Sequence, residues 1–290
     1  MKNNGDIQKK LLKAQQSELT EYETYKGLAA RTTNTANRSV LLHIAEDEKK
    51  HYKFWRKYTK KDIGPSWWKV YSYVFLSKIF GLIFVVSLME KKEECAQMDC
   101  KKLRVYIPHI ETIIQNERKH ERALLKLINE ERQKYVSSIV LGISDALIEI
   151  TGALAGLTFA LQNTSLIDIA GLVTGIAAAL SMASSEYQSI KTEHTKKKPF
   201  TAAIYTGIVY FLTVLSLVLP FFIFSSPFLS LSFTVASALI IIFVFTYYIS
   251  ITQRISFRMR FLEMAAICLS VATLSFILGY ILRISFGMGA

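Results

Sequence analysis

Two short motifs, Glu48-Lys-Lys-His51 and Glu117-Arg-Lys-His120, place a carboxylate and an imidazole three residues apart. On a helix, residues at this spacing lie on one face about one turn apart, so the two side chains can bind one metal ion together. Each motif also follows a glutamate by 27 residues, Glu21 in the first case and Glu90 in the second. The repeated pattern predicts a site for two metal ions held by carboxylates and imidazoles.

The spacing also predicts the elements that must bring these residues together. The midpoint between Glu21 and Glu48 falls in the polar stretch 32–37, and the midpoint between Glu90 and Glu117 lies beside the segment 104–108. Two helices joined at such a point and packed antiparallel place both members of a pair at the same height. Because every corresponding residue recurs after 69 positions, we expect a duplicated helical hairpin.

Glutamates interrupt apolar stripes that should be buried in this hairpin. Glu18 and Glu21 share one face of the first expected helix with Leu11 and Leu28, and Glu48 lies on the apolar face of the second. A buried carboxylate without a partner is costly, so these positions indicate a partner cation or a bound metal. Hard carboxylate oxygens with imidazole suit Fe(II) or Mn(II), and zinc is compatible by ligand type.

Charge divides the chain into two parts. Residues 1–135 hold 27 Lys and Arg with 17 Asp and Glu, whereas residues 136–290 hold only 8 and 6. We therefore expect a charged metal-binding domain over 1–135 and a membrane domain over 136–290. The net charge of +12 does not indicate a nucleic-acid partner, because the basic residues alternate with acids along helical faces; it favours a lipid bilayer.

Five membrane-spanning helices are predicted in the second part. Their approximate ranges are 136–161, 167–190, 202–224, 228–251 and 262–283. The connections 191–198 and 253–260 are strongly basic, whereas the other two carry no charge. The positive-inside rule then places the first domain in the cytoplasm, at the cytoplasmic membrane, with the C-terminus outside.

The run 70–89 is long and apolar enough for a sixth span, with Lys78 as its only charge. We prefer to place it in the metal-binding domain, because a span ending at Met89 would separate Glu90 from Glu21.

Within the predicted spans, Asp145 and Glu149 lie one helical turn apart and Glu186 lies near an inner helix end. Ionisable residues in spans indicate function, and Met182 on the face of Glu186 adds a soft thioether ligand.

Residues 6–134 resemble the rubrerythrin and ferritin-like superfamily. The resemblance implies an all-α chain that begins with a ferritin-like four-helix bundle and a di-iron centre. It adds Glu93 to the ligands, giving Glu21, Glu48, His51, Glu90, Glu93, Glu117 and His120. Tyr25 follows Glu18 as a tyrosine follows the first-helix ligand of the family, so Glu18 competes with Glu21. The chain departs from rubrerythrin by lacking a cysteine-rich electron-transfer module.

The segments 142–161 and 175–190, GISDALIEITGALAGLTFAL and GIAAALSMASSEYQSI, resemble the first two spans of the vacuolar iron transporter family. That family consists of five-span homodimeric exchangers that move Fe(II), and often Mn(II), out of the cytosol against protons. The resemblance places the metal pathway at Asp145 and Met182, with Glu149 and Glu186 as adjoining carboxylates. An acidic metal-binding insert of the family is replaced here by a short basic connection.

Together these features predict a divalent metal exporter with a cytoplasmic domain that captures or senses iron. The alternative is a membrane-anchored ferroxidase or peroxidase whose di-iron centre does the redox chemistry. Acidic residues inside the spans favour the exporter, because a simple anchor has no need of them.

Overall fold

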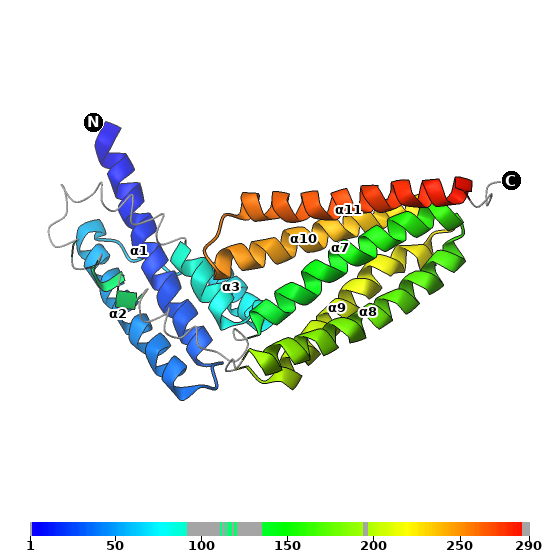
Figure 1. Cartoon of the computed structure of the whole chain (residues 1–290). Helices are drawn as coiled ribbons and strands as arrows, with labels where there is room; N and C mark the ends of the chain where they lie inside the picture. The colour runs from blue at the N-terminus through cyan, green and yellow to red at the C-terminus, as the bar shows by residue number, and fades with distance from the viewer. Residues whose placement is uncertain are drawn as a thin grey trace. The chain divides into compact units, whose positions relative to one another are not determined.

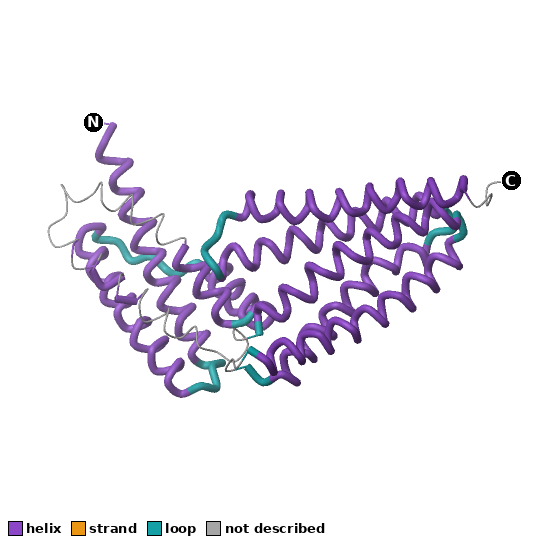
Figure 2. The backbone as a smooth tube through the Cα atoms, viewed as in Figure 1, coloured by secondary structure: helices purple, strands orange, loops and turns teal. Residues whose placement is uncertain are grey.

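The computed structural model describes residues 2–91, 111, 113, 115–117, 119–120, 135–193 and 197–285. The chain forms two compact units, Met1–Asn129 with Ile251–Gln253 and Glu130–Ser250 with Arg254–Ala290. Throughout the described ranges every regular element is a helix and no strand occurs (Figure 2). The all-helical fold class is therefore confirmed for this part of the chain.

The first unit begins with a hairpin of two long helices, α1 (Lys2–Ala29) and α2 (Thr35–Thr59), which pack against each other (Figure 1). Asn34 starts α2, because its side chain accepts hydrogen bonds from the backbone N–H groups of Ala36 and Asn37. These bonds satisfy two of the N–H groups that have no partner within the helix. The hairpin loop thus falls in the polar stretch where the sequence placed it.

Gln15 fixes the register of the two helices at the far end of the hairpin. Its side chain is fully buried, donates to the carbonyl of Lys61 at 2.9 Å and accepts from the hydroxyl of Thr59 at 2.5 Å. Beside it, Leu11 and Trp55 form a small core with Ile113. Ile113 therefore brings the helical residues of the range 111–120 against the hairpin.

Gly81 interrupts the apolar run 70–89. Helix α3 (Trp67–Phe80) ends there, and the chain is helical again over 82–91. Gly81 has φ of 87°, which an L side chain rarely adopts. Neither piece is long enough to cross a bilayer, and α3 packs on α1, with Val74 lying over Gly27. A complete four-helix bundle stays a prediction, because 92–110 and 121–134 lie outside the described residues.

The second unit contains five helices long and apolar enough to cross a membrane, by length and composition. They agree with the predicted spans to within a few residues, except that the first turns of α8 and α11 start earlier. Their bounds are α7 (Val136–Leu161), α8 (Thr164–Thr192), α9 (Pro199–Ile223), α10 (Pro227–Thr252) and α11 (Phe257–Ser285).

Helix α7 is central to this unit and packs against α8, α9 and α11, while α8 also packs along α9. Fully buried leucines and isoleucines of α7, among them Leu147 and Leu154, meet Val214 and Leu217 of α9. At the α7–α11 contact the backbones nearly touch, because a Cβ on Gly279 would lie 2.2 Å from the carbonyl oxygen of Gly156. Such small residues allow helices to approach closely in a membrane. The acids of α7 are therefore carried by a helix that packs against three others.

Replacing Gln15 with alanine should destabilise the first unit. The Thr59 hydroxyl and the Lys61 carbonyl would lose their buried partner, which lowers the free energy of unfolding by about 1–3 kcal/mol. All three tryptophans lie in this unit, so urea unfolding of the full chain followed by tryptophan fluorescence measures it. Gln16→Ala is the matched control because its hydrogen bond to Gly64 is exposed; equal loss in both variants would contradict the assignment.

Candidate metal centre and membrane acids

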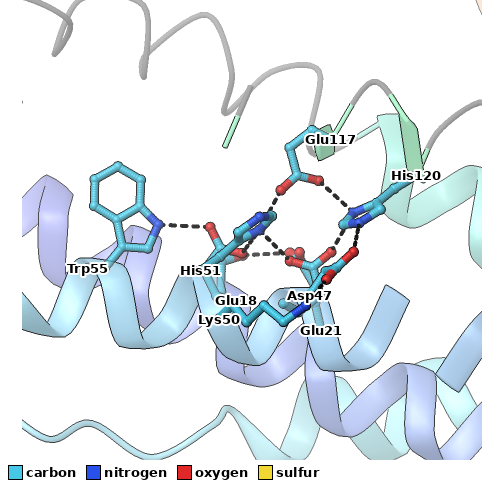
Figure 3. A network of polar contacts seen from close by, with 10 residues as sticks. Glu18, Glu21, Asp47, Lys50, His51, Trp55, Glu117 and His120 are labelled. Atoms are coloured by element: carbon cyan, nitrogen blue, oxygen red, sulfur yellow. Dashed lines mark hydrogen bonds and ion pairs between the residues drawn. The ribbon is translucent and has the colours of Figure 1, made fainter. Parts of the chain in front are cut away.

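Four potential metal ligands converge inside the first unit. One ligand atom each from Glu18, Glu48, His51 and Glu117 lies within 4.8 Å of the others. Glu18 comes from α1, Glu48 and His51 from α2, and Glu117 from the helical range 111–120, so three segments supply the group (Figure 3). His120 lies against the same carboxylates. We call these five residues the candidate metal centre.

The two histidines present the same ring nitrogen to the carboxylates. His51 Nδ1 lies 2.8 Å from Glu117, 3.3 Å from Glu48 and 3.5 Å from Glu18. His120 Nδ1 lies 3.2 Å from Glu48 and 3.5 Å from Glu117. Glu48 and Glu117 each approach both imidazoles, as their positions in the two repeated motifs predicted. This arrangement places two carboxylates between two nitrogen donors.

Burial governs the charges of the centre. Glu48 is 1 % exposed; burial and then the nearby charge of Glu117 raise its pKa well above the usual range. Burial also raises the pKa of Glu117, but the nearby imidazoles of His120 and His51 outweigh it and the net pKa is lowered. For His120, burial lowers the pKa, yet Glu117 and Glu48 outweigh it and raise the pKa to about 10. The same balance raises the pKa of His51. Without metal the carboxylates therefore make both imidazoles hold their protons more firmly than a free histidine does.

Several polar atoms of the centre fit a bound metal better than they fit one another. Glu48 Oε1, Glu117 Oε2 and His120 Nδ1 are buried and make no well-formed hydrogen bond within the described part of the chain. Buried polar atoms normally have partners. Three carboxylates with imidazole nitrogen are a suitable donor set for Fe(II), Mn(II) or Zn(II). The residues present thus fit the implied metal.

The structure brings Glu18 rather than Glu21 into the group of four. Trp55 Nε1 donates to Glu18 Oε1 at 2.9 Å and holds that carboxylate beside His51, whereas Glu21 accepts from Ser17 at 2.9 Å. Glu21 as a ligand therefore stays a prediction. Glu90 is buried at 5 % exposure but is not one of the four converging residues, and Glu93 lies outside the described residues.

Asp47 is a functional candidate that the motif did not reveal. Its Oδ2 lies 3.1 Å from His120 Nε2 and its Oδ1 2.7 Å from Lys50 Nζ. Burial opposes the charge of Asp47, but these two partners outweigh burial and lower its pKa. An ionised carboxylate at Nε2 keeps the imidazole oriented with Nδ1 toward the ligands. The clue in the sequence was its place next to Glu48.

A pocket of about 510 Å³ lies beside His120 and Asp47. Its lining comes from α2 and the helical range 111–120 and consists of Ser39, Val40, His43, Ile44, Asp47, Asn116, Lys119 and His120. The pocket provides space next to the candidate metal centre that a small ion can occupy.

In the second unit, two of the predicted acids are held by neutral hydroxyls. Glu149 accepts from the Tyr210 hydroxyl at 2.5 Å, joining α7 to α9. Glu186 is buried and accepts from Ser138 at 2.5 Å, joining α8 to α7. Asp145 interacts electrostatically with both Glu149 and Tyr210. Tyr210 was not foreseen, because a tyrosine in an apolar span gives no distinctive sequence signal.

The remaining membrane candidates differ in exposure. Asp145 and Met182 are half-buried, and Met182 packs against the hydrophobic core of the unit, whereas Glu149 is exposed in the single chain. Asp168 of α8 was overlooked, although the rule for acids in spans applies to it. It is 8 % exposed, and its Oδ1 has no hydrogen-bond partner among the residues that the structure describes.

The second unit thus has the features of a multi-pass helical membrane protein with acidic groups inside its spans. The sequence model of the VIT family matches residues 136–197, which include both segments that resemble vacuolar iron transporters. The match and the five apolar helices together indicate a metal-ion transporter domain. No curated protein and no solved structure gives a significant match to the chain.

Replacing Glu48 with glutamine should strongly weaken metal binding. The amide keeps the size of the side chain but cannot supply the carboxylate that faces both histidines and that a metal would bind. We expect the affinity for Mn(II) to fall by more than the roughly 10–100-fold typical of losing an outer partner of a ligand. Isothermal titration of the purified chain measures this. Glu46→Gln, an exposed position on the same helix, is the control and should keep wild-type affinity.

Metal affinity should rise with pH. A metal binds neutral imidazole, so binding must displace the protons that the raised pKa values of His51 and His120 retain. Each displaced proton steepens the dependence by up to about tenfold per pH unit. Titrations with Mn(II) in buffers of different ionisation enthalpy count the released protons. His194→Gln, a histidine of the connection 191–198, should leave that count unchanged; binding without proton release would contradict the prediction.

Proposed function

We propose that the chain is a divalent metal exporter that lowers cytosolic Fe(II), with Mn(II) as a second cargo. The observation that carries the proposal is the presence, in one chain, of a buried carboxylate and histidine cluster and of acids inside spans that match the VIT family. The first unit would capture or sense the metal, and the second would move it. We assign different functions to the two sites, because the carboxylate and histidine cluster is enclosed in the first unit and the acids of the second lie within the candidate spans.

Capture rests on the candidate metal centre. Glu18, Glu48, His51, Glu117 and His120 would hold a di-metal cofactor, with Glu21, Glu90 and Glu93 as further proposed ligands. The bound metal would supply Lewis acidity and, for iron, redox chemistry. The chain's own contribution is to desolvate the ligands and to keep His120 oriented through Asp47. The pocket beside His120 provides a route by which an ion reaches the centre.

Transfer across the bilayer would use Glu186, Met182, Asp145 and Glu149. Protonation and metal binding compete for the same carboxylate oxygens, so release of a cation and uptake of a proton can be coupled. The hydroxyls of Ser138 and Tyr210 hold Glu186 and Glu149 in place without neutralising their charge. A passing cation or proton would therefore find an uncompensated carboxylate.

Charge and exposure support a proposed orientation and assembly. The basic connections 191–198 and 253–260 favour a cytoplasmic first unit and an outside C-terminus, in the cytoplasmic membrane. Glu149 is exposed although it lies within a span, and an acid facing lipid is costly. A homodimer in which the partner or an aqueous pathway covers this face of α7 removes that cost.

A ferroxidase or peroxidase is the second candidate function. The observation that favours it is the approach of both Nδ1 atoms to the same two carboxylates, an arrangement suited to a di-iron centre. Oxygen consumption after Fe(II) addition, lost in Glu48→Gln while transport persists, would assign the redox reaction to the first unit. Transport without oxygen consumption would leave capture as its role.

Replacing Asp145 with asparagine should abolish metal flux but leave metal binding by the first unit intact. The amide cannot exchange a proton for a cation, and it lies in the other unit from the metal centre. Fe(II) and Mn(II) uptake into inside-out vesicles, with and without a pH gradient, measures the flux. Glu263→Gln is the matched control because this exposed acid pairs with Arg260. Wild-type flux in Asp145→Asn would refute the assigned pathway.

A further inference from the structure

Helix α3 carries an apolar face that no described part of the chain covers. Seven large apolar side chains are exposed among the described residues of the first unit, and five of them lie on this one helix. The main stripe recurs at helical spacing: Trp68 is 82 % exposed, Tyr71 66 %, Phe75 61 % and Ile79 56 %. Trp67 stacks on Tyr71 and widens the stripe. Such a patch on one helix face is a binding surface rather than scattered exposure.

The opposite face of α3 is already occupied. Val70, Tyr73 and Val74 are buried, Val74 lies over Gly27 of α1, and Arg31 donates to the carbonyl of Val74 at 3.4 Å. The helix is therefore fixed to the first unit, and its apolar stripe is turned outward. Rotating α3 about its axis to bury the stripe would expose Val70, Tyr73 and Val74 instead.

The charges and aromatic groups of residues 63–89 indicate that the apolar face of α3 binds lipid. Residues 63–89 contain no Asp or Glu, and their two charged residues are Lys69 and Lys78, both exposed. Tryptophan and tyrosine are favoured at the boundary between headgroups and acyl chains, and lysines beside them gain from anionic lipid. A helix held to the unit by one face can therefore lie along the membrane plane with these aromatic groups in the boundary region. The five spans of the same chain keep a bilayer within reach.

We propose that α3 is an interfacial helix that docks the first unit onto an anionic bilayer surface through Trp67, Trp68, Tyr71, Phe75 and Ile79. The contact would hold the candidate metal centre close to the membrane that the cargo must cross. This proposal does not depend on the transport function, because it concerns the surface of α3 alone.

Tryptophan fluorescence tests the contact directly. The chain has three tryptophans: Trp55 is buried at 1 % exposure, and the other two, Trp67 and Trp68, lie on α3. The full chain is placed in phosphatidylcholine–phosphatidylglycerol nanodiscs with or without brominated acyl chains, which quench tryptophans in contact with them. We expect bromolipid to quench the wild type and to leave the Trp67→Phe/Trp68→Phe variant, which retains Trp55, unquenched.

Aqueous acrylamide distinguishes the other outcomes. Quenching of Trp67 and Trp68 by acrylamide but not by bromolipid would show a water-exposed helix and overturn the proposal. Quenching by neither would show that protein, such as a second copy, covers the face, and would overturn it too. A charge in the stripe, Phe75→Glu, should reduce bromolipid quenching, whereas Leu42→Glu, an exposed apolar position of α2, should not. Each charge placed in the Trp67→Phe/Trp68→Phe background should leave Trp55, the remaining tryptophan, shielded from acrylamide, which shows that the unit is folded.

Discussion

Negative charge confined where water is excluded is the constraint on which this structure depends. In the first unit, Glu48 and Glu117 are almost completely buried and face each other's charge. The histidines of the two motifs resolve the conflict, because a protonated imidazole is stabilised by the same carboxylates that a metal would bind. The fold around them is arranged to keep these groups in contact: Asn34 starts α2, Gln15 fixes its register and Trp55 holds Glu18.

The second unit meets the same constraint with different chemistry. Its acids are held by hydroxyls of Ser138 and Tyr210, which donate hydrogen bonds but carry no charge. A protonated histidine in their place would pair with the carboxylate and occupy the position of a cation. Neutral donors therefore suit a cation that binds transiently, whereas the ionic network of the first unit suits a cation that stays bound. The two units differ in how firmly they would hold a positive ion.

The sequence predicted what depends on periodicity and missed what depends on side-chain orientation. Helical spacing located both motifs, and hydropathy located the spans, because one residue type repeats over many turns. The choice between Glu18 and Glu21 depends instead on the indole of Trp55, which binds Glu18. Helical spacing could not distinguish the two glutamates, because they lie on the same face of one helix. The break at Gly81 was hidden in an apolar run, because one glycine does little to hydropathy. Asp47 was hidden because its partner, His120, is 73 residues away.

The predicted duplication of the hairpin makes its departures from symmetry informative. Asp47 orients His120, but the residue 69 positions later is Asn116, and His51 Nε2 has no hydrogen-bond partner in the described structure. Glu18 corresponds to Ser87, so the extra carboxylate occurs on one side only. In a centre of two ions, the ion beside His51 would meet more negative charge, and the one beside His120 a more rigidly oriented imidazole. Because carboxylate charge strengthens cation binding and a fixed imidazole preserves geometry, the two positions would differ in affinity although the same motif supplies both.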